Sequence, residues 1–461
     1  MTHIRIKKGL DIPLKGHPIQ RNSISEKEIS PLSDAVQVGL DCTTFEDCKF
    51  QLLVKPGDAI AIGEPLAEDK TCPGRMLTSP AGGIVKEIRR GAKRALKDII
   101  VEIAKEEEFK NFKKIDPFKE TRSVLVQYFL EAGIFFNIRK RPFNLLADPQ
   151  QIPQSIFVKA IESAPFQPPS ELQIKGYEKE FQLGLSVLSR LTNGPVHLIY
   201  KKGSSLKAFT EAKDVEKHTA EGPHPVGTFS VLIQHLDRIK SPADNIWTLT
   251  AHDVLAMGYL LLHGRLFVER IISIAGPGIL PDKVGFFKAR LGYPIEQLLQ
   301  GRVQKGEVRF ISGDPLMGIR VNRDDFLGVN HFVFSALPEN NHREFMHFFG
   351  LGLNKYSASK AYLAGHLSKT EKEYDFTTNQ HGEARPFIDS ALYDKVQPLE
   401  ISTMLLVKSV LAEDYELAEA YGLLEVDSED FALATFVCPS KMEMTEIIKK
   451  GIRQYAKEII Q

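Results

Sequence analysis

The spacing of apolar residues changes near residue 108, and this change limits the folds that the chain can adopt. Before that point, runs such as FQLLVKPGDAIAIGEPLAED (50–69) alternate apolar and polar residues and are broken by Pro-Gly-Asp and Gly-Glu-Pro turns. Short strands that are interrupted this often predict a small antiparallel barrel or sandwich over residues 1–108. After a charged, unpatterned stretch (105–120), runs with helical spacing alternate with buried-strand runs, which predicts a parallel α/β layer over 115–255.

Two further regions follow. Between residues 256 and 335 the pattern gives a strand, a turn, a short helix and another strand, which predicts a compact α+β module. Residues 375–461 have helical spacing and predict a terminal helical domain. The fold class expected from these four regions is a multidomain α/β and α+β protein, which suits a length of 461 residues.

Charge and hydropathy exclude two classes of protein. Lysine plus arginine equals aspartate plus glutamate, at 59 each, and zero net charge argues against a nucleic-acid binder. The longest apolar run, from Val254, is interrupted by His263, Arg265 and Glu269, so no segment of the sequence is expected to span a membrane. The opening MTHIRIKKGL contains no apolar core of a secretory signal.

The cysteines are scattered. Cys42, Cys48, Cys72 and Cys438 form no C-x-x-C pair and no metal-ligand spacing, as in a reduced, cytoplasmic protein. Because one thiolate cannot hold an iron–sulfur cluster, Cys438 next to Pro439 is not expected to carry one. The spacing predicts no metal site.

Lys70 raises the question of a swinging cofactor. The pattern V-x-x-G-D-A-I-x-x-G-x-x-L followed by S-P-x-x-G-x-V resembles biotinyl and lipoyl carrier domains, which hold their cofactor on a lysine at a hairpin tip. The segment TCPGRMLT after Lys70 is longer and stiffer than an exposed tight turn, since it contains Pro73 and Gly74. We therefore expect an unmodified barrel-sandwich scaffold with Lys70 as a solvated turn residue, and a true biotin or lipoyl carrier is the alternative.

Nucleotide binding lacks its usual loop. The chain contains no G-x-G-x-x-G, and the loop GPHPVG (222–227) has two prolines that remove backbone N–H groups needed by a phosphate. We expect no flavin or nicotinamide to be held by this chain. A flavin or iron–sulfur electron-transfer subunit remains the alternative.

One segment suits a quinone. GIFFNIRKRPF (133–143) combines aromatic rings with guanidinium donors, which together fit a planar ligand that carries carbonyl groups. A domain interface, with the phenylalanines in the core and the arginines paired, would use the same residues. No catalytic residue is predicted, and the candidates for quinone binding are Phe136, Arg139, Arg141, Phe143 and, in the GPHP loop, His224.

The motifs occur together in a recognisable order. IRIKKGLDIPLKG, EDKTCPGRMLTSPAGGIVKEIRRGAKRAL, RKRPF, GPHPVG, GEVRFISGDPLMG and ATFVCPSK follow one another along the sequence, which resembles the NqrA family of the Na⁺-translocating NADH:quinone reductase from residue 1 to about 461. The resemblance implies a peripheral subunit on the cytoplasmic, inner face of the bacterial cell membrane. The partners of such a subunit would be the other five subunits of the complex and ubiquinone or menaquinone. The role of the subunit would be to support quinone reduction coupled to sodium export.

The resemblance also implies a fold and a distribution of cofactors. The implied fold is similar to that of the flavin-carrying subunit of respiratory complex I. It consists of a barrel-sandwich hybrid domain (1–108), a Rossmann-like domain (115–255), a β-grasp module of a kind that binds soluble ligands in other proteins (256–335) and a helical domain (375–461). The glycine-rich flavin loop and the cluster cysteines of those relatives are missing here. FMN, FAD, riboflavin and iron–sulfur centres are therefore expected in the other subunits, and none in this chain.

Overall fold

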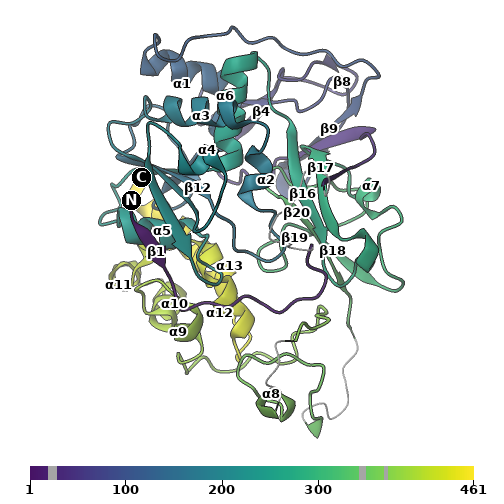
Figure 1. Ribbon diagram of the computed structural model, residues 1–461, viewed down its shortest axis with the longest axis vertical. Coiled ribbons are helices and arrows are strands. Elements are labelled where there is room, and N and C mark those ends of the chain that lie inside the picture. The colour runs from purple at the N-terminus through teal and green to yellow at the C-terminus, as the bar shows by residue number, and fades with distance from the viewer. Residues whose placement is uncertain (19–28, 342–348, 368–371, 461) are drawn as a thin grey trace.

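The computed structural model describes residues 1–18, 29–341, 349–367 and 372–460. Residues 19–28 of the predicted first domain and Gln461 of the predicted last domain lie outside the described residues. Figure 1 shows the teal α/β layer with the yellow C-terminal helices below it and a green sheet to its right. No helix in the described ranges is both long enough and apolar enough to cross a membrane.

The barrel predicted for the first part of the chain consists of two antiparallel sheets. One has the strand order β3-β9-β8-β5 and the other β4-β6-β7. Their inward side chains, including Val38, Leu66, Val85 and Val101, form one buried cluster. The bounds are β3 (Gln37–Asp41), β4 (Phe50–Leu52), β5 (Ala59–Ile60), β6 (Pro65–Asp69), β7 (Met76–Thr78), β8 (Gly83–Arg90), the short η2 (Ala92–Arg94) and β9 (Leu96–Ile103).

A seven-stranded sheet forms the α/β layer, in the order β1-β14-β13-β12-β15-β10-β11. The first five strands of this order are parallel to one another, and β10 pairs antiparallel with both β15 and β11. The strands are β1 (His3–Arg5), β10 (Arg139–Arg141), β11 (Leu145–Leu146), β12 (Ser155–Ala160), β13 (Val196–Lys201), β14 (Glu216–Glu221) and β15 (Ile246–Thr250). The helices are α1 (Arg122–Glu131), η3 (Ile134–Phe136), α2 (Ser170–Ile174), α3 (Glu178–Leu188), α4 (Lys207–Thr210), α5 (Phe229–Leu236) and α6 (Ala251–His263).

Alternate residues of this sheet enter different cores, as the two-residue period of a strand requires. Ile156 and Val158 of β12 pack with residues of α1, α3 and α6, whereas Phe157 packs in the cluster that contains residues of α5 and the C-terminal helices. The helical region thus covers one face of the sheet. Its elements are α9 (Tyr393–Val396), α10 (Thr403–Leu411), α11 (Tyr415–Ala420), η6 (Leu423–Glu425), η7 (Ser428–Phe431), α12 (Ala432–Val437) and α13 (Met444–Ile460), and the short α8 (Ala364–Leu367) precedes them.

Two glycines let α3 and α6 approach each other closely. A Cβ on Gly258 would lie 1.7 Å from the carbonyl oxygen of Glu180, and one on Gly184 would lie 2.1 Å from that of Val254. These neighbours are backbone atoms of helices, which cannot move aside as a flexible side chain can. The crossing therefore requires glycine, and it fixes the position of α6, which carries polar residues of the site described below.

The α+β module is a six-stranded mixed sheet with the order β19-β18-β20-β16-β17-β2. Its elements are β16 (Glu269–Ala275), η4 (Pro281–Lys283), β17 (Gly285–Arg290), α7 (Ile295–Leu299), β18 (Val308–Ser312), β19 (Ile319–Val321) and β20 (Val333–Pro338), with β2 (Ile29–Pro31) from the start of the chain. The predicted succession is a strand, a turn, a short helix and another strand, and the structure places a second strand, β17, between the turn and the short helix α7.

The first strands do not belong to the barrel sheets. β1 pairs in parallel with β14, where His3 faces Thr219, and β2 pairs in parallel with β17, where Ile29 faces Phe286. An all-β interpretation of residues 1–108 assigns these strands to the wrong sheets, since three-residue strands carry too short a pattern to identify their partners. The domain boundary at residue 108 itself stays a prediction.

Candidate functional site

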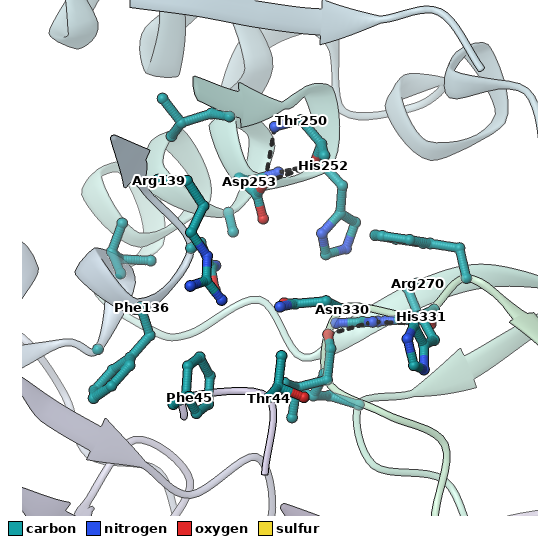
Figure 2. A pocket seen from close by; sticks show the side chains of 18 of the residues that line it. Thr44, Phe45, Phe136, Arg139, Thr250, His252, Asp253, Arg270, Asn330 and His331 are labelled. Atoms are coloured by element: carbon teal, nitrogen blue, oxygen red, sulfur yellow. Dashed lines mark hydrogen bonds between the residues drawn. The ribbon is translucent and has the colours of Figure 1, made fainter. Parts of the chain in front are cut away.

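A cavity of about 510 Å³ lies where the four regions meet. This volume falls within the range of roughly 300–1,000 Å³ that is usual for small-molecule sites. In Figure 2 the side chains of Arg139, Asp253 and Asn330 point into the same space, with the rings of Phe45 and Phe136 below them. Further lining residues are Leu40 and Leu77 of the barrel, Lys159 and His252 of the α/β layer, Arg270 and His331 of the α+β module, and Asp427 and Glu429 of the helical region.

One polar wall comes from the junction of β15 and α6. Thr250 ends the strand and caps the helix: its N–H and its hydroxyl both donate to Asp253 Oδ2, at 2.8 and 2.6 Å. Burial raises the pKa of Asp253, and the two bonds from Thr250 oppose that rise. These residues lie at the carboxyl end of a parallel strand, the edge at which α/β sheets bind their ligands.

Two arginines bring positive charge to the cavity. Arg270 Nη1 donates to the carbonyl oxygens of Val329 at 2.7 Å and His331 at 3.2 Å, and burial lowers the pKa of Arg270 to about 10. Arg139 is half-buried, and burial lowers its pKa too. Within the described part of the chain, the guanidinium of Arg139 donates no hydrogen bond, so its donors are available to a ligand.

Buried acids lie near Lys159, a third cation that lines the cavity. Lys159 Nζ lies 3.1 Å from Glu162 Oε2, and both side chains are largely shielded from water. Burial raises the pKa of Glu429, and Lys159 opposes the rise. A carboxyl whose pKa is raised in this way can hold a proton nearer to neutral pH than an ordinary one. The cavity therefore contains hydrogen-bond donors, positive charge and proton-holding groups on different walls.

Three of the five residues predicted to bind quinone line the cavity: Phe136, Arg139 and Arg141. Arg141 is only 1% exposed, and its guanidinium donates to Ser230 Oγ and to the carbonyl oxygen of Glu425, both at 3.0 Å. Its donors are thus largely committed to joining the α/β layer to the helical region.

Phe143 and His224 are placed elsewhere. The ring of Phe143 packs edge-on against Tyr455 of α13, with centroids 6.1 Å apart, and does not line the cavity. His224 is buried beside Ser163, with Nδ1 3.0 Å from its Oγ, and its backbone N–H donates to Asp11 Oδ1 at 2.8 Å. Burial lowers the pKa of His224 to about 4. The N-terminal segment covers this loop, and both residues act in packing.

Several lining residues were not predicted from the sequence. His252 and Asp253 follow a buried strand directly, so the rule that ligands bind at carboxyl strand ends could have identified them. Arg270, Asn330 and His331 come from another region of the chain, and no local pattern indicates that they meet the α/β layer. Glu429 is brought in from the helical region in the same way.

Lys70 and the cysteines, which are candidate reactive groups in the sequence, lie in ordinary environments. Lys70 is exposed in the turn after β6. Tyr393 Oη lies 3.1 Å from Cys438 Sγ in a buried contact, and burial raises the pKa of Cys48 to about 12. Neither cysteine has the environment of a reactive thiolate.

The buried imidazole of His252 makes stability depend on pH in a known direction. Burial, reinforced by the nearby Arg270, lowers the pKa of His252 from 6.5 to about 3. Below pH 6.5 the unfolded chain therefore binds a proton that the folded chain does not, so this contribution to stability is complete above pH 6.5 and is lost as the pH falls toward the folded-state pKa. The unfolding free energy of the wild type, relative to a His252→Gln variant, is expected to fall by about 1.4 kcal/mol per pH unit below the ordinary histidine pKa. Urea unfolding of both proteins at neutral and mildly acidic pH measures this difference, and parallel curves would contradict it.

Known proteins resemble the chain over nearly its whole length. Three family models match: the NqrA N-terminal barrel-sandwich hybrid domain (4–104), the NqrA second alpha/beta domain (120–266) and the NQRA C-terminal domain (271–323). The NqrA subunit of the Na(+)-translocating NADH-quinone reductase of Chlamydia caviae is 35% identical over 99% of this chain and 97% of its own. The corresponding subunit of Saccharophagus degradans is 34% identical over 99% of this chain and 100% of its own length. A solved NAD⁺-reducing hydrogenase covers 68% of this chain and 56% of its own at 9% identity, with a TM-score of 0.35 that is too low to bear on function. The chain belongs to the NqrA family, whose members are subunits of the Na⁺-translocating NADH-quinone reductase, an oxidoreductase complex.

Proposed function

We propose that this chain is a peripheral subunit of a sodium-translocating NADH:quinone reductase and that its central cavity takes the head group of a quinone, ubiquinone or menaquinone. The observation that carries the proposal is the position of Arg139, whose donors are free beside aromatic rings in a cavity of suitable size. Family membership supplies the class of reaction.

The aromatic wall suits a planar ring. The centroids of Phe45 and Phe136 lie 4.7 Å apart, and the guanidinium carbon of Arg139 lies 5.9 Å from the centroid of Phe45. A quinone ring against these side chains would bring a carbonyl oxygen toward Arg139. A hydrogen bond from such a charged donor is worth roughly 1.5–3 kcal/mol.

Reduction of a quinone to a quinol requires two electrons and two protons. Negative charge that develops on the quinone oxygens would be stabilised by Arg139 and Arg270, and Asp253 and Glu429, whose pKa values are raised by burial, can supply protons. The electrons would come from flavin and iron–sulfur centres of the other five subunits, because we propose that this chain holds no redox cofactor of its own. The loop at 222–227 supports that view: the backbone N–H of His224 already donates to Asp11 Oδ1 and that of Gly227 to Ser163 Oγ, and two prolines remove further donors.

The finer description of the fold is part of the same proposal. The parallel strands with intervening helices support a Rossmann-like domain over 115–255. The mixed sheet with its short helix supports a β-grasp module over 256–335, between a barrel-sandwich domain (1–108) and a helical domain (375–461). The protein would sit on the inner, cytoplasmic face of the bacterial membrane, and its role there would be to support sodium export.

Arg139→Ala tests the quinone site. We expect the affinity for a water-soluble short-chain quinone to fall about ten- to a hundredfold, because each 1.4 kcal/mol lost is a factor of about ten. Calorimetric titration of the purified chain measures this affinity. Arg320→Ala, which removes an exposed arginine outside the cavity, is the matched control and should bind as the wild type does. Unchanged affinity in a well-folded Arg139→Ala variant would show that the cavity is not the quinone site.

A further inference from the structure

Two histidines and a glutamate meet on neighbouring strands, away from the cavity. His197 is the second residue of β13 and lies opposite Glu216, the first residue of β14, while His218 is two residues further along β14. The two-residue period of a strand places Glu216 and His218 on the same face. In the described part of the chain this is the one set of three such side chains with its ligand atoms all within 4.8 Å of one another.

The spacing of the three ligand atoms fits a metal ion. His197 Nδ1 lies 3.1 Å from His218 Nε2 and 3.6 Å from Glu216 Oε2, and the His218 and Glu216 atoms are 3.8 Å apart. A tetrahedral site with bonds of about 2.0–2.1 Å has edges of about 3.3–3.4 Å. The observed triangle differs from this by a few tenths of an ångström, so side-chain rotation alone would close it around an ion.

Both imidazoles are shielded from water, since His197 and His218 are 5% and 4% exposed. The backbone N–H of Thr2 donates to His218 Nδ1 at 3.3 Å, so His218 Nε2 carries the proton and donates it to His197 Nδ1. Because His197 Nδ1 then accepts, His197 Nε2 carries the proton of its own ring. This nitrogen is buried and has no hydrogen-bond partner in the described residues.

We propose that His197, Glu216 and His218 bind a divalent transition-metal ion, Zn²⁺ above all, with water in the fourth position. Imidazole and carboxylate ligands suit such an ion, and Glu216, whose side chain is 63% exposed, leaves the site open to solvent. Spacing along the sequence predicts no metal site, since His197 lies 19 and 21 residues before the other two ligands and only the strand register brings it to them.

The site would link β13 to β14 and take no part in quinone chemistry. All three ligands lie toward the amino ends of β13 and β14, whereas the cavity lies at the carboxyl ends of β12 and β15, where Lys159 and Thr250 line it. Metal binding at His218 Nε2 moves the ring proton to Nδ1, so the contact with Thr2 has to open. The inference is therefore independent of the proposed quinone site.

Titration with Zn²⁺ tests the proposal. The full chain, freed of metal with a chelator, is titrated by calorimetry, and Co²⁺ serves as a spectroscopic probe. We expect one ion per chain, with micromolar affinity or tighter, and the intense visible absorption of tetrahedral Co²⁺. His218→Gln should weaken binding at least a hundredfold, and Glu216→Gln about tenfold. His366→Gln, which removes an exposed histidine of α8, is the matched control and should bind as the wild type does.

Glu216→Gln keeps the test decisive should a buried histidine variant fail to fold, because this side chain is largely exposed. Circular dichroism confirms the fold of each variant. Absence of stoichiometric binding in the wild type would overturn the proposal. So would a single site that survives Glu216→Gln and His218→Gln unchanged in folded protein.

Discussion

Replacing Arg141 by alanine is expected to lower the free energy of unfolding by about 3 kcal/mol, because it removes a positive charge that offsets the burial of Asp430. Asp430 is only 4% exposed. Burial raises the pKa of Asp430, and Arg141 is the first of the interactions that oppose this rise. Without the guanidinium, Ser230 Oγ and the carbonyl oxygen of Glu425 also lose a donor. Urea unfolding of the purified chain measures the loss.

Arg139→Ala is the matched control for this experiment. It removes the same side chain two residues earlier on β10, at a position that is half-buried and faces the cavity. We expect it to change stability by only about 1 kcal/mol, because its guanidinium donates no hydrogen bond within the described residues and its cation–π contact with Phe45 is worth about 0.5–1 kcal/mol. Equal stability of the two variants would show that Arg141 does not join the α/β layer to the helical region. Loss of quinone binding in Arg141→Ala would be uninformative because the fold itself is weakened.

Gly258→Ala is expected to cost at least about 3 kcal/mol, at the upper end of what overpacking costs. The new methyl group would lie 1.7 Å from the carbonyl oxygen of Glu180, so α3 and α6 would have to separate. The higher helix propensity of alanine returns only about 1 kcal/mol. Because α6 begins at the cavity wall, we also expect weaker quinone binding. Thermal unfolding and the same calorimetric titration measure both effects.

Gly91→Ala provides the comparison for that change. A Cβ at Gly91 meets no atom within 4 Å, and the backbone there has a φ of −95°, which any residue adopts. The free energy of unfolding of the Gly91→Ala variant should stay within about 0.5 kcal/mol of that of the wild type. A Gly258→Ala variant as stable as Gly91→Ala would mean that the helix crossing can relax.

Local patterns of the sequence were sufficient to predict the elements whose partners are near in the chain. The run QSIFVKAI became β12 and EKEFQLGLSVLSRLT became α3, and the succession of strands and helices gave the α/β layer. β1 could not be predicted in this way. Its partner is more than 200 residues away, and three residues have too few side chains to specify a register.

The candidate site was only partly predictable for a related reason. Aromatic and basic composition identified Phe136 and Arg139, but composition does not indicate which side chains reach a shared space. Phe143 lies in the turn between β10 and β11 and packs against α13, and Arg141 is committed to Ser230. The residues that complete the cavity, Arg270 and His331 among them, become neighbours only when separate regions dock.

The pairing of β1 and β2 with late strands has a consequence for synthesis on the ribosome. Arg5 faces Glu221, and Ile29 faces Phe286, so neither strand has its partner until more than 200 further residues have been made. At about 5–20 residues per second, that interval is on the order of 10–50 s. The barrel, whose strands lie between residues 37 and 103, can close during this time. Until then β1 and β2 of the nascent chain have no strand to pair with. β1 can join its sheet only after Glu221 has been made, and β2 only after β17 has been made, which is beyond the middle of the 461-residue chain.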